Sequence, residues 1–199
     1  MRKRKSRKRF FERKKLLRGA RLIFGRRASD GFTLIELMVV VLVLAVLVSI
    51  AVAVYIDSRK TAADNTRLAN AKVLQEVLMR YRFDTGNFPA NTDNDYGGWD
   101  GDRDGMFIRP LSQNHYLKKD IKDPKDPTGT LYNSSGNWHY YRYAPGSYGA
   151  DPAKGYYCVF GIRDMEKSGR PHPLSPGWRT PGRNWQNEFD WVDGFYQYP

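Results

Sequence analysis

Apolar residues form one long, uninterrupted run near the start of the chain. Residues 37–56 carry no formal charge and are bounded by Glu36 and Asp57. A helix of this length rises about 30 Å, which matches the hydrocarbon thickness of a bilayer. The Val and Ile content would suit a strand, but strands rarely exceed about ten residues. The length therefore predicts a membrane-spanning helix.

The helical pattern continues beyond this run with an amphipathic period. Apolar residues recur every three or four positions, which is typical of a helix with one buried face. This stripe consists of Leu68, Ala71, Leu74, Leu78 and Tyr81, widened by Val73 and Val77. Gly86 can take the left-handed conformation that ends a helix, and Pro89 prevents its continuation. We predict one helix over residues 33–85, apolar all round at first and amphipathic afterwards.

The remaining chain, residues 89–199, has no helical period and is rich in Gly, Pro, Asn, Asp and aromatic residues. Residues 137–145 and 155–162 are bounded by turn residues and predict strands. Residues 172–199 predict an irregular region that aromatic side chains hold against the rest. These side chains are Trp178, Trp185, Phe189, Trp191, Phe195 and Tyr196. We predict an α+β fold, in which the long helix packs its stripe on a small antiparallel sheet.

The net charge of +12 is confined to the first residues. Residues 1–31 contain fourteen Lys or Arg against Glu12 and Asp30, whereas residues 32–199 contain nineteen basic and nineteen acidic side chains. A charge block at one end is typical of a tail or topology signal, so we expect no nucleic-acid partner. By the positive-inside rule, the basic end stays in the cytoplasm and the rest of the chain lies across the membrane.

The residues that carry enzyme chemistry do not form a recognisable pattern. His115, His139 and His172 are scattered, and the chain lacks a nucleophile elbow, a phosphate loop and a dinucleotide fingerprint. We therefore expect no catalytic activity. Cys158 is the only cysteine, which excludes an intramolecular disulfide, and its apolar flanks predict a buried thiol.

The boundary between the basic and apolar segments carries the most specific motif. Residues 31–36, Gly-Phe-Thr-Leu-Ile-Glu, resemble the processing site of the type IV pilin and pseudopilin superfamily. The resemblance implies a pilin fold, cleavage between Gly31 and Phe32 by a prepilin peptidase, and methylation of the new amino terminus. Residues 1–31 would then be a leader peptide. The alternative, a secretory-type cut after Ala53, would remove the first part of the continuous helix.

Glu36 places a carboxylate at the start of the apolar run. An ionised side chain in the membrane costs about 2.5–3.5 kcal/mol on insertion scales, so Glu36 should have a partner. The resemblance implies that it pairs with the terminal ammonium of Phe32 in a neighbouring subunit as a filament assembles. Loss of residues 1–31 would also remove the charge of +12 that holds this end in the cytoplasm.

The end of the helix resembles one group within the superfamily, the major pseudopilins of type II secretion. The matching residues are Tyr81, Asp84, Gly86, Phe88 and Pro89, followed downstream by Asp123 and Pro124. The lack of a C-terminal disulfide loop favours the same group over adhesive pilins. Ala45 and Ala53 depart from it, because the family often has Gly and Pro there. The resemblance implies an assembly helix at 32–56, an amphipathic half at 57–88 and a periplasmic β-rich region at 89–199.

The resemblance implies a structural subunit that polymerises through its N-terminal helix into a helical homo-oligomer, a pseudopilus that drives protein export across the outer membrane. Its partners would be minor pseudopilins, an inner-membrane assembly platform and the prepilin peptidase. Before assembly it would cross the inner membrane once, with a cytoplasmic N-terminus and a periplasmic globular part. Two alternatives remain: a type IV pilin for adhesion, motility or DNA uptake, and a membrane-anchored calcium- or sugar-binding domain that does not polymerise.

An acidic segment offers a candidate metal site. Its carboxylates are those of Asp93, Asp95, Asp100, Asp102 and Asp104. The spacing of the last three resembles the first half of an EF-hand loop, but Leu111 stands where the final Glu would be. Hard oxygen ligands favour calcium as the cofactor, and a solvated loop without metal is an equal alternative. By position in the resemblance, Asp164 and Glu166 are second candidates.

Overall fold

The computed structural model of this 199-residue chain describes residues 31–92, 98–103, 106–126, 136–167 and 169–198. The chain divides into two compact units, residues 1–48 and 49–199. Helix α2 (Leu34–Thr85) begins in the first unit and ends in the second. All the described strands belong to the second unit.

Helix α2 confirms the predicted long helix, starting one residue later than expected. Its 52 residues contain neither Gly nor Pro, so no position interrupts the backbone hydrogen bonds. Gly86 ends the helix with a φ of 81°, and its N–H donates to the Arg82 carbonyl at 2.8 Å. In the first unit, residues 34–48 are exposed on every side of the helix, as the apolar pattern predicts.

In the second unit, the amphipathic stripe of α2 forms one wall of a hydrophobic core. Ala71, Leu74 and Leu78 are buried, and Leu68, Val77 and Tyr81 pack partly buried against the same core. The prediction that Val73 widens this stripe is wrong, because its side chain is 46 % exposed. Val73 precedes Leu74 by one residue, which turns it about 100° away from the packed face.

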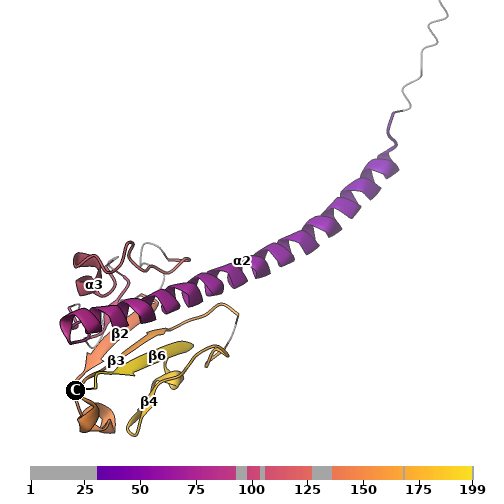
Figure 1. The fold of residues 1–199 in the computed structure, drawn as a ribbon. Coiled ribbons are helices and arrows are strands. Elements are labelled where there is room, and N and C mark those ends of the chain that lie inside the picture. The colour runs from indigo at the N-terminus through magenta and orange to yellow at the C-terminus, as the bar shows by residue number, and fades with distance from the viewer. Residues whose placement is uncertain (1–30, 93–97, 104–105, 127–135, 168, 199) are drawn as a thin grey trace, which may run out of the picture. The chain divides into compact units, whose positions relative to one another are not determined.

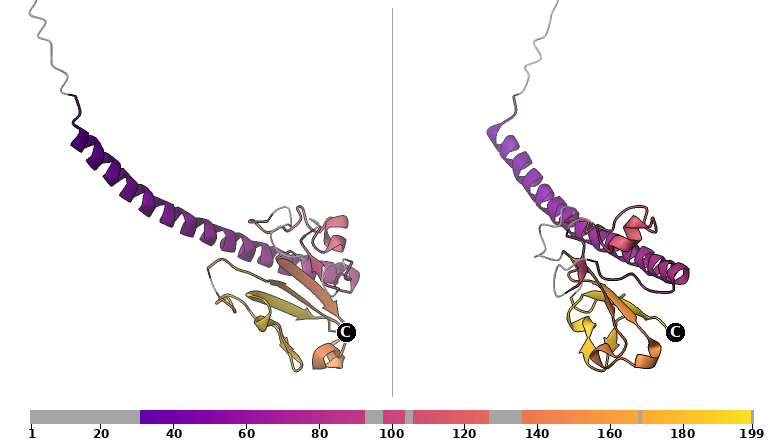
Figure 2. Two further views of the ribbon diagram at one scale, coloured as in Figure 1. Left: turned by 180° about the vertical axis from the view of Figure 1, so that it is seen from behind. Right: turned by 90° about the vertical axis from the view of Figure 1, so that its left-hand side faces the viewer.

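The main sheet is antiparallel, with the strand order β1 (Asp100–Gly101), β2 (Trp138–Tyr143), β3 (Tyr157–Ile162) and β6 (Trp191–Tyr196). Strands β2 and β3 confirm the two predicted strands. Figures 1 and 2 show the magenta part of α2 alongside this sheet, with the short helix α3 (Arg109–Gln113) on the opposite side of α2. The predicted α+β fold is therefore confirmed.

Strand β3 is buried on both faces of the sheet. Cys158 and Phe160 face the core beneath α2, whereas Tyr157 and Val159 face a second core on the other side. The other buried members of this second core are Trp99, Tyr143, Ala150, Trp185, Phe189 and Val192, with Trp178 and Tyr196 partly buried against it. The aromatic residues of the C-terminal region therefore hold it against the sheet, as predicted.

The chain between β2 and β6 is largely irregular outside β3. Its described residues include the short 3-10 turns η1 (Ser147–Gly149), η2 (Pro152–Lys154) and η3 (Trp185–Asn187). It also contains a small ribbon in which β4 (Arg179–Thr180) pairs with β5 (Arg183–Asn184).

Strand β6 is an element that the sequence analysis did not identify, because its Asp193-Gly194 pair is typical of a turn. In the structure, Asp193 accepts a hydrogen bond from Gln75 of α2 at 2.6 Å. A β-carbon at Gly194 would lie 2.6 Å from the Cys158 carbonyl oxygen. Asp193 therefore contacts the helix and Gly194 lets β6 approach β3 closely, while the backbone stays extended.

Arg67 of α2 is a fully buried charge. Its Nε and one terminal nitrogen donate to the Asp123 carboxylate at 2.7 and 2.8 Å, and the other terminal nitrogen donates to Asp64 at 2.9 Å. The Glu166 carboxylate lies 3.5 Å away. Burial tends to raise the pKa of Asp123, but hydrogen bonds from Arg67 and Asn137 and the charge of Arg67 hold it below its ordinary value. Arg67 thus ties the helix to two distant segments.

We expect Arg67→Met to lower the free energy of unfolding of the second unit by about 3–5 kcal/mol, because it leaves buried carboxylates without their cation. All five tryptophans lie beyond residue 98, so tryptophan fluorescence of the full-length chain in detergent reports this unit during urea titration. Arg80→Met is the matched control on the same helix, since the Arg80 side chain is 75 % exposed. The control should change stability by less than about 1 kcal/mol. Equal losses in the two variants would contradict the structural role of Arg67.

Candidate functional site

The predicted cleavage position lies just before α2. Residues 31–33 are not helical, and the helix begins at Leu34. A β-carbon added at Gly31 would meet nothing within 4 Å, and Phe32 is 86 % exposed. The backbone between Gly31 and Phe32 is therefore accessible within the described part of the chain, as a peptidase substrate requires.

Thr33 and Glu36 form a reciprocal set of hydrogen bonds at the start of the helix. The Thr33 N–H and hydroxyl donate to Glu36 Oε2 at 2.8 and 2.9 Å, and the Glu36 N–H donates to Thr33 Oγ1 at 3.2 Å. This arrangement is a capping box, which satisfies N–H groups that a helix N-terminus otherwise leaves unpaired. Its Thr-x-x-Glu spacing is visible in the sequence, yet Thr33 was absent from the predicted site residues.

The capping box also fixes where the Glu36 carboxylate points. Both hydrogen bonds from Thr33 reach Oε2, and Oε1 accepts none from the residues that the structure describes. The carboxylate lies at the positive end of the helix dipole, where a negative charge is stabilised. One oxygen of an oriented carboxylate is therefore available to accept a hydrogen bond from a further cation.

The predicted calcium ligands are only partly described. Asp93, Asp95 and Asp104 lie outside the described residues, and Asp100 is buried, with Oδ1 accepting from the Thr92 N–H at 2.9 Å. Among the described residues, no group of three or more His, Cys, Asp or Glu side chains is arranged to hold a metal ion. Calcium binding by this segment stays a prediction.

Asp102 instead holds together two backbone segments. Its Oδ1 accepts from the Asn137 and Trp138 N–H groups at 2.8 and 3.1 Å, and its Oδ2 accepts from the Asp123 N–H at 3.1 Å. Burial raises the pKa of Asp102 to about 6, although the three N–H groups favour the carboxylate. Asp102 therefore joins the start of β2 to the segment that carries Asp123.

The second calcium candidates contact protein groups. Glu166 lies 2.6 Å from the Lys125 ammonium and 3.5 Å from Arg67, so two cations of the chain already offset its charge. Asp164 exchanges backbone hydrogen bonds with the Asn137 side chain at 2.9 and 3.1 Å. The Glu166 carboxylate therefore has protein partners, whereas the hydrogen bonds of Asp164 involve its backbone and not its carboxylate.

The buried thiol and one histidine are core residues. Cys158 has no exposed surface, and burial raises the pKa of its thiol, which confirms the predicted buried cysteine. Burial lowers the pKa of His139 to about 4, so its ring is neutral, and it packs against Trp99 and Phe189.

Comparison with known proteins gives one match. Residues 26–52 match the family model described as the prokaryotic N-terminal methylation motif. No curated protein and no solved structure matches the chain. The matched segment includes Gly31, Phe32 and Glu36, and it supports a type IV pilin-like protein, a class that is structural rather than catalytic.

We expect Thr33→Val to speed hydrogen exchange of the first amides of α2 about fivefold, because losing the hydroxyl of a helix cap costs about 1 kcal/mol. The measurement is hydrogen–deuterium exchange with mass spectrometry on the full-length chain in detergent. Thr33→Ser keeps the hydroxyl and should exchange like the wild type. If Thr33→Val also exchanged like the wild type, the cap would contribute nothing.

Proposed function

We propose that this chain is the precursor of a pseudopilus subunit of the type II secretion kind. A prepilin peptidase cuts it between Gly31 and Phe32, the new terminus is methylated, and the mature subunits polymerise through their N-terminal helices. The observation that carries this proposal is an accessible Gly-Phe bond directly before a capped helix that exposes apolar side chains all round. The match to the methylation motif at residues 26–52 supports it.

The exposed apolar side chains require a covering environment. By length and composition, α2 can cross a membrane, and its side chains over residues 34–56 are exposed on all faces. A surface helix of a soluble domain is apolar on one stripe only, whereas lipid or neighbouring helices can cover a helix that is apolar all round. Lipid would cover these side chains before assembly, and the helices of neighbouring subunits would cover them in the filament.

The charge distribution supports the orientation of the chain in the membrane. Residues 1–31 carry the whole net charge of +12, which favours a cytoplasmic N-terminus and a periplasmic second unit. Cleavage after Gly31 removes this charge. The helix end can then leave the cytoplasmic side of the membrane without moving fourteen basic side chains into lipid. The first partner is therefore the prepilin peptidase, and the later partners are copies of the chain, minor pseudopilins and an assembly platform.

The resemblance at the end of the helix favours a major pseudopilin over a pilin, and in the structure its residues have definite roles. Gly86 takes the left-handed position, Phe88 is 1 % exposed in the core, and Asp84 accepts a hydrogen bond from the Tyr116 hydroxyl at 2.9 Å. These residues of the Tyr81–Pro89 motif thus stop the helix and attach the following segment. A pilin for adhesion, motility or DNA uptake would share the processing site, so it is the second candidate.

The mature N-terminus tests the processing step. We expect intact-mass and peptide spectra of the membrane-extracted protein to show a chain that begins with N-methylated Phe32. Gly31→Val should leave the leader attached, because a branched side chain obstructs the peptidase, whereas Gly25→Val in the same leader should be processed. A chain that starts at Val54, or one that keeps Met1, would contradict the proposal.

Glu36→Ala tests assembly. Loss of the carboxylate leaves each terminal ammonium buried without its partner, at about 3–5 kcal/mol per contact, so filament yield should fall at least a hundredfold. Membrane insertion, measured by resistance to alkaline extraction, should persist. Glu76→Ala on the exposed face of the same helix is the matched control. Unchanged filaments in Glu36→Ala, or no filaments in the wild type, would favour an anchored domain that does not polymerise.

A further inference from the structure

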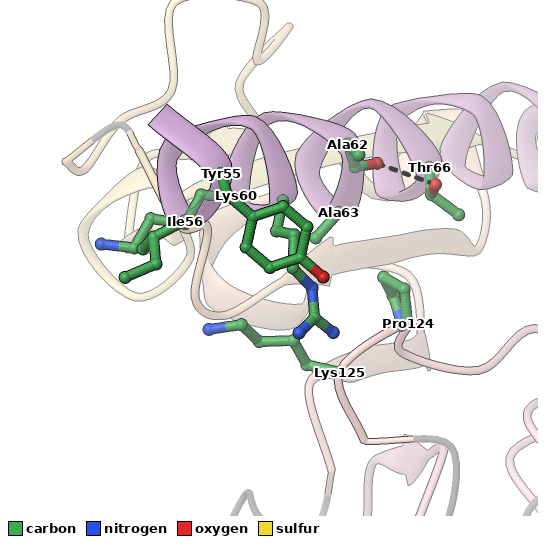
Figure 3. A pocket seen from close by; sticks show the side chains of 9 residues that line it. Tyr55, Ile56, Lys60, Ala62, Ala63, Thr66, Pro124 and Lys125 are labelled. Atoms are coloured by element: carbon green, nitrogen blue, oxygen red, sulfur yellow. Dashed lines mark hydrogen bonds between the residues drawn. The ribbon is translucent and has the colours of Figure 1, made fainter. Parts of the chain in front are cut away.

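A cavity of about 420 Å³ lies between α2 and the segment that carries Pro124 and Lys125, within the second unit. Figure 3 shows Tyr55, Lys60 and Thr66 along the helix side, with Pro124 and Lys125 facing them. Arg59 also lines it. Positions 55, 59, 62 and 66 follow one another at intervals of three or four, so they share one face of the helix. This cavity is called the basic pocket below.

Small side chains create the space. Ala62, Ala63 and Thr66 form the helical wall, and the Thr66 hydroxyl donates to the Ala62 carbonyl at 2.9 Å, which keeps it close to the helix. Arg67, the next residue, turns the other way into its buried ion pairs with Asp64 and Asp123. These pairs hold the loop at Pro124 near the helix without filling the gap.

The charge of the basic pocket is not balanced by its surroundings. In the part of the chain that the structure describes, Arg59 and Lys60 form no ion pair, and Arg59 lies 5.8 Å from the Tyr55 ring centre. Lys125 pairs with Glu166 at 2.6 Å.

The neighbouring carboxylates are already engaged elsewhere. Asp57 pairs with Lys167 at 2.7 Å, and Asp64 pairs with Arg67 at 2.9 Å. Within the described residues, Arg59 and Lys60 therefore line the cavity beside Tyr55 without a counter-ion, which is the chemistry of an anion site.

The place of the pocket along the helix identifies the anion. The apolar run ends at Ile56, and Arg59 and Lys60 follow about 4.5–6 Å further along the axis. The polar headgroup layer is about 5–8 Å deep on each side of the hydrocarbon. Tyr55, at the end of the apolar run, is of the type that marks the membrane–water interface. This placement rests on the membrane insertion in the proposed function. In that insertion, the Arg59 and Lys60 side chains lie at the level of the lipid phosphates.

We propose that the basic pocket binds the phosphate group of an anionic phospholipid in the leaflet on the globular side of the membrane. Arg59 and Lys60 supply the positive charge and the N–H donors, Tyr55 borders the acyl region, and Ala62 and Thr66 leave room for the headgroup. A zwitterionic lipid offers the same phosphate together with its own cation, which the uncompensated Arg and Lys disfavour. The preference is therefore for phosphatidylglycerol over phosphatidylcholine.

The test uses the full-length, uncleaved chain in nanodiscs of phosphatidylcholine, titrated with headgroup-labelled phosphatidylglycerol. We expect at least a tenfold preference for phosphatidylglycerol, lost in Arg59→Gln/Lys60→Gln. The matched control is Lys72→Gln/Arg80→Gln, which removes one Lys and one Arg from exposed positions of the same helix and should keep affinity within twofold. Ala62→Phe fills the cavity without changing charge and should also remove the preference.

The outcomes separate the pocket from the proposed function. If the chain resists alkaline extraction but binds both lipids equally, the lipid site is wrong and the proposed function stands. The same conclusion follows if a pocket variant keeps the wild-type lipid preference. Arg59 and Lys60 would then be available to bind an acidic surface of a partner protein instead. Displacement of the labelled lipid by an equal concentration of soluble glycerol phosphate overturns the lipid as the source of the phosphate. A chain that fails to insert contradicts the proposed function and the placement that rests on it.

Discussion

One continuous helix has to be stable in two different surroundings, and the rest of the molecule depends on that constraint. Helix α2 runs without Gly or Pro from Leu34 to Thr85, so its backbone needs no outside partner over this length. Its side chains decide what surrounds it. From Leu37 to Ile56 they carry no formal charge and are exposed all round, whereas beyond Asp57 one apolar stripe packs into the core. The change at Asp57 therefore separates a part that needs lipid or other helices from a part that the chain covers itself.

The sequence was sufficient for the regular parts of the fold and insufficient for its polar interior. The helix, its stop at Gly86 and strands β2 and β3 follow from periodicity and turn residues, which are local signals. Strand β6 and the ion pairs of Arg67 do not, because they depend on contacts between positions far apart in the chain, such as Arg67 with Asp123 and Gln75 with Asp193. An Arg on an amphipathic helix is ordinarily solvated. Only the fold shows that three carboxylates converge on Arg67.

The candidate sites also differ in whether they depend on residues close in sequence or far apart in the chain. Gly31, Phe32 and Glu36 are close in sequence, so a linear motif was enough to propose this site, and the structure added Thr33 to it. The acidic segment is the contrary case, because carboxylates close in sequence do not necessarily face one another. Asp102 turns into the protein and accepts three backbone N–H groups, at Asn137, Trp138 and Asp123. A backbone that needs these acceptors competes with any metal for them.

In the proposed assembly, the capping box would hold the Glu36 carboxylate in one orientation before its partner arrives. Its hydrogen bonds involve the N–H and hydroxyl of Thr33, and both groups stay in the chain if the bond before Phe32 is cut. The same hydrogen bonds can therefore orient the carboxylate through Oε2 in the leader-bearing chain and in the proposed mature chain, and they leave Oε1 for another donor. Less side-chain freedom is lost when a preoriented carboxylate meets an ammonium, so more of their attraction remains as net affinity. In the proposed filament, Thr33 therefore positions the group on which register depends, although it contacts no neighbouring subunit itself.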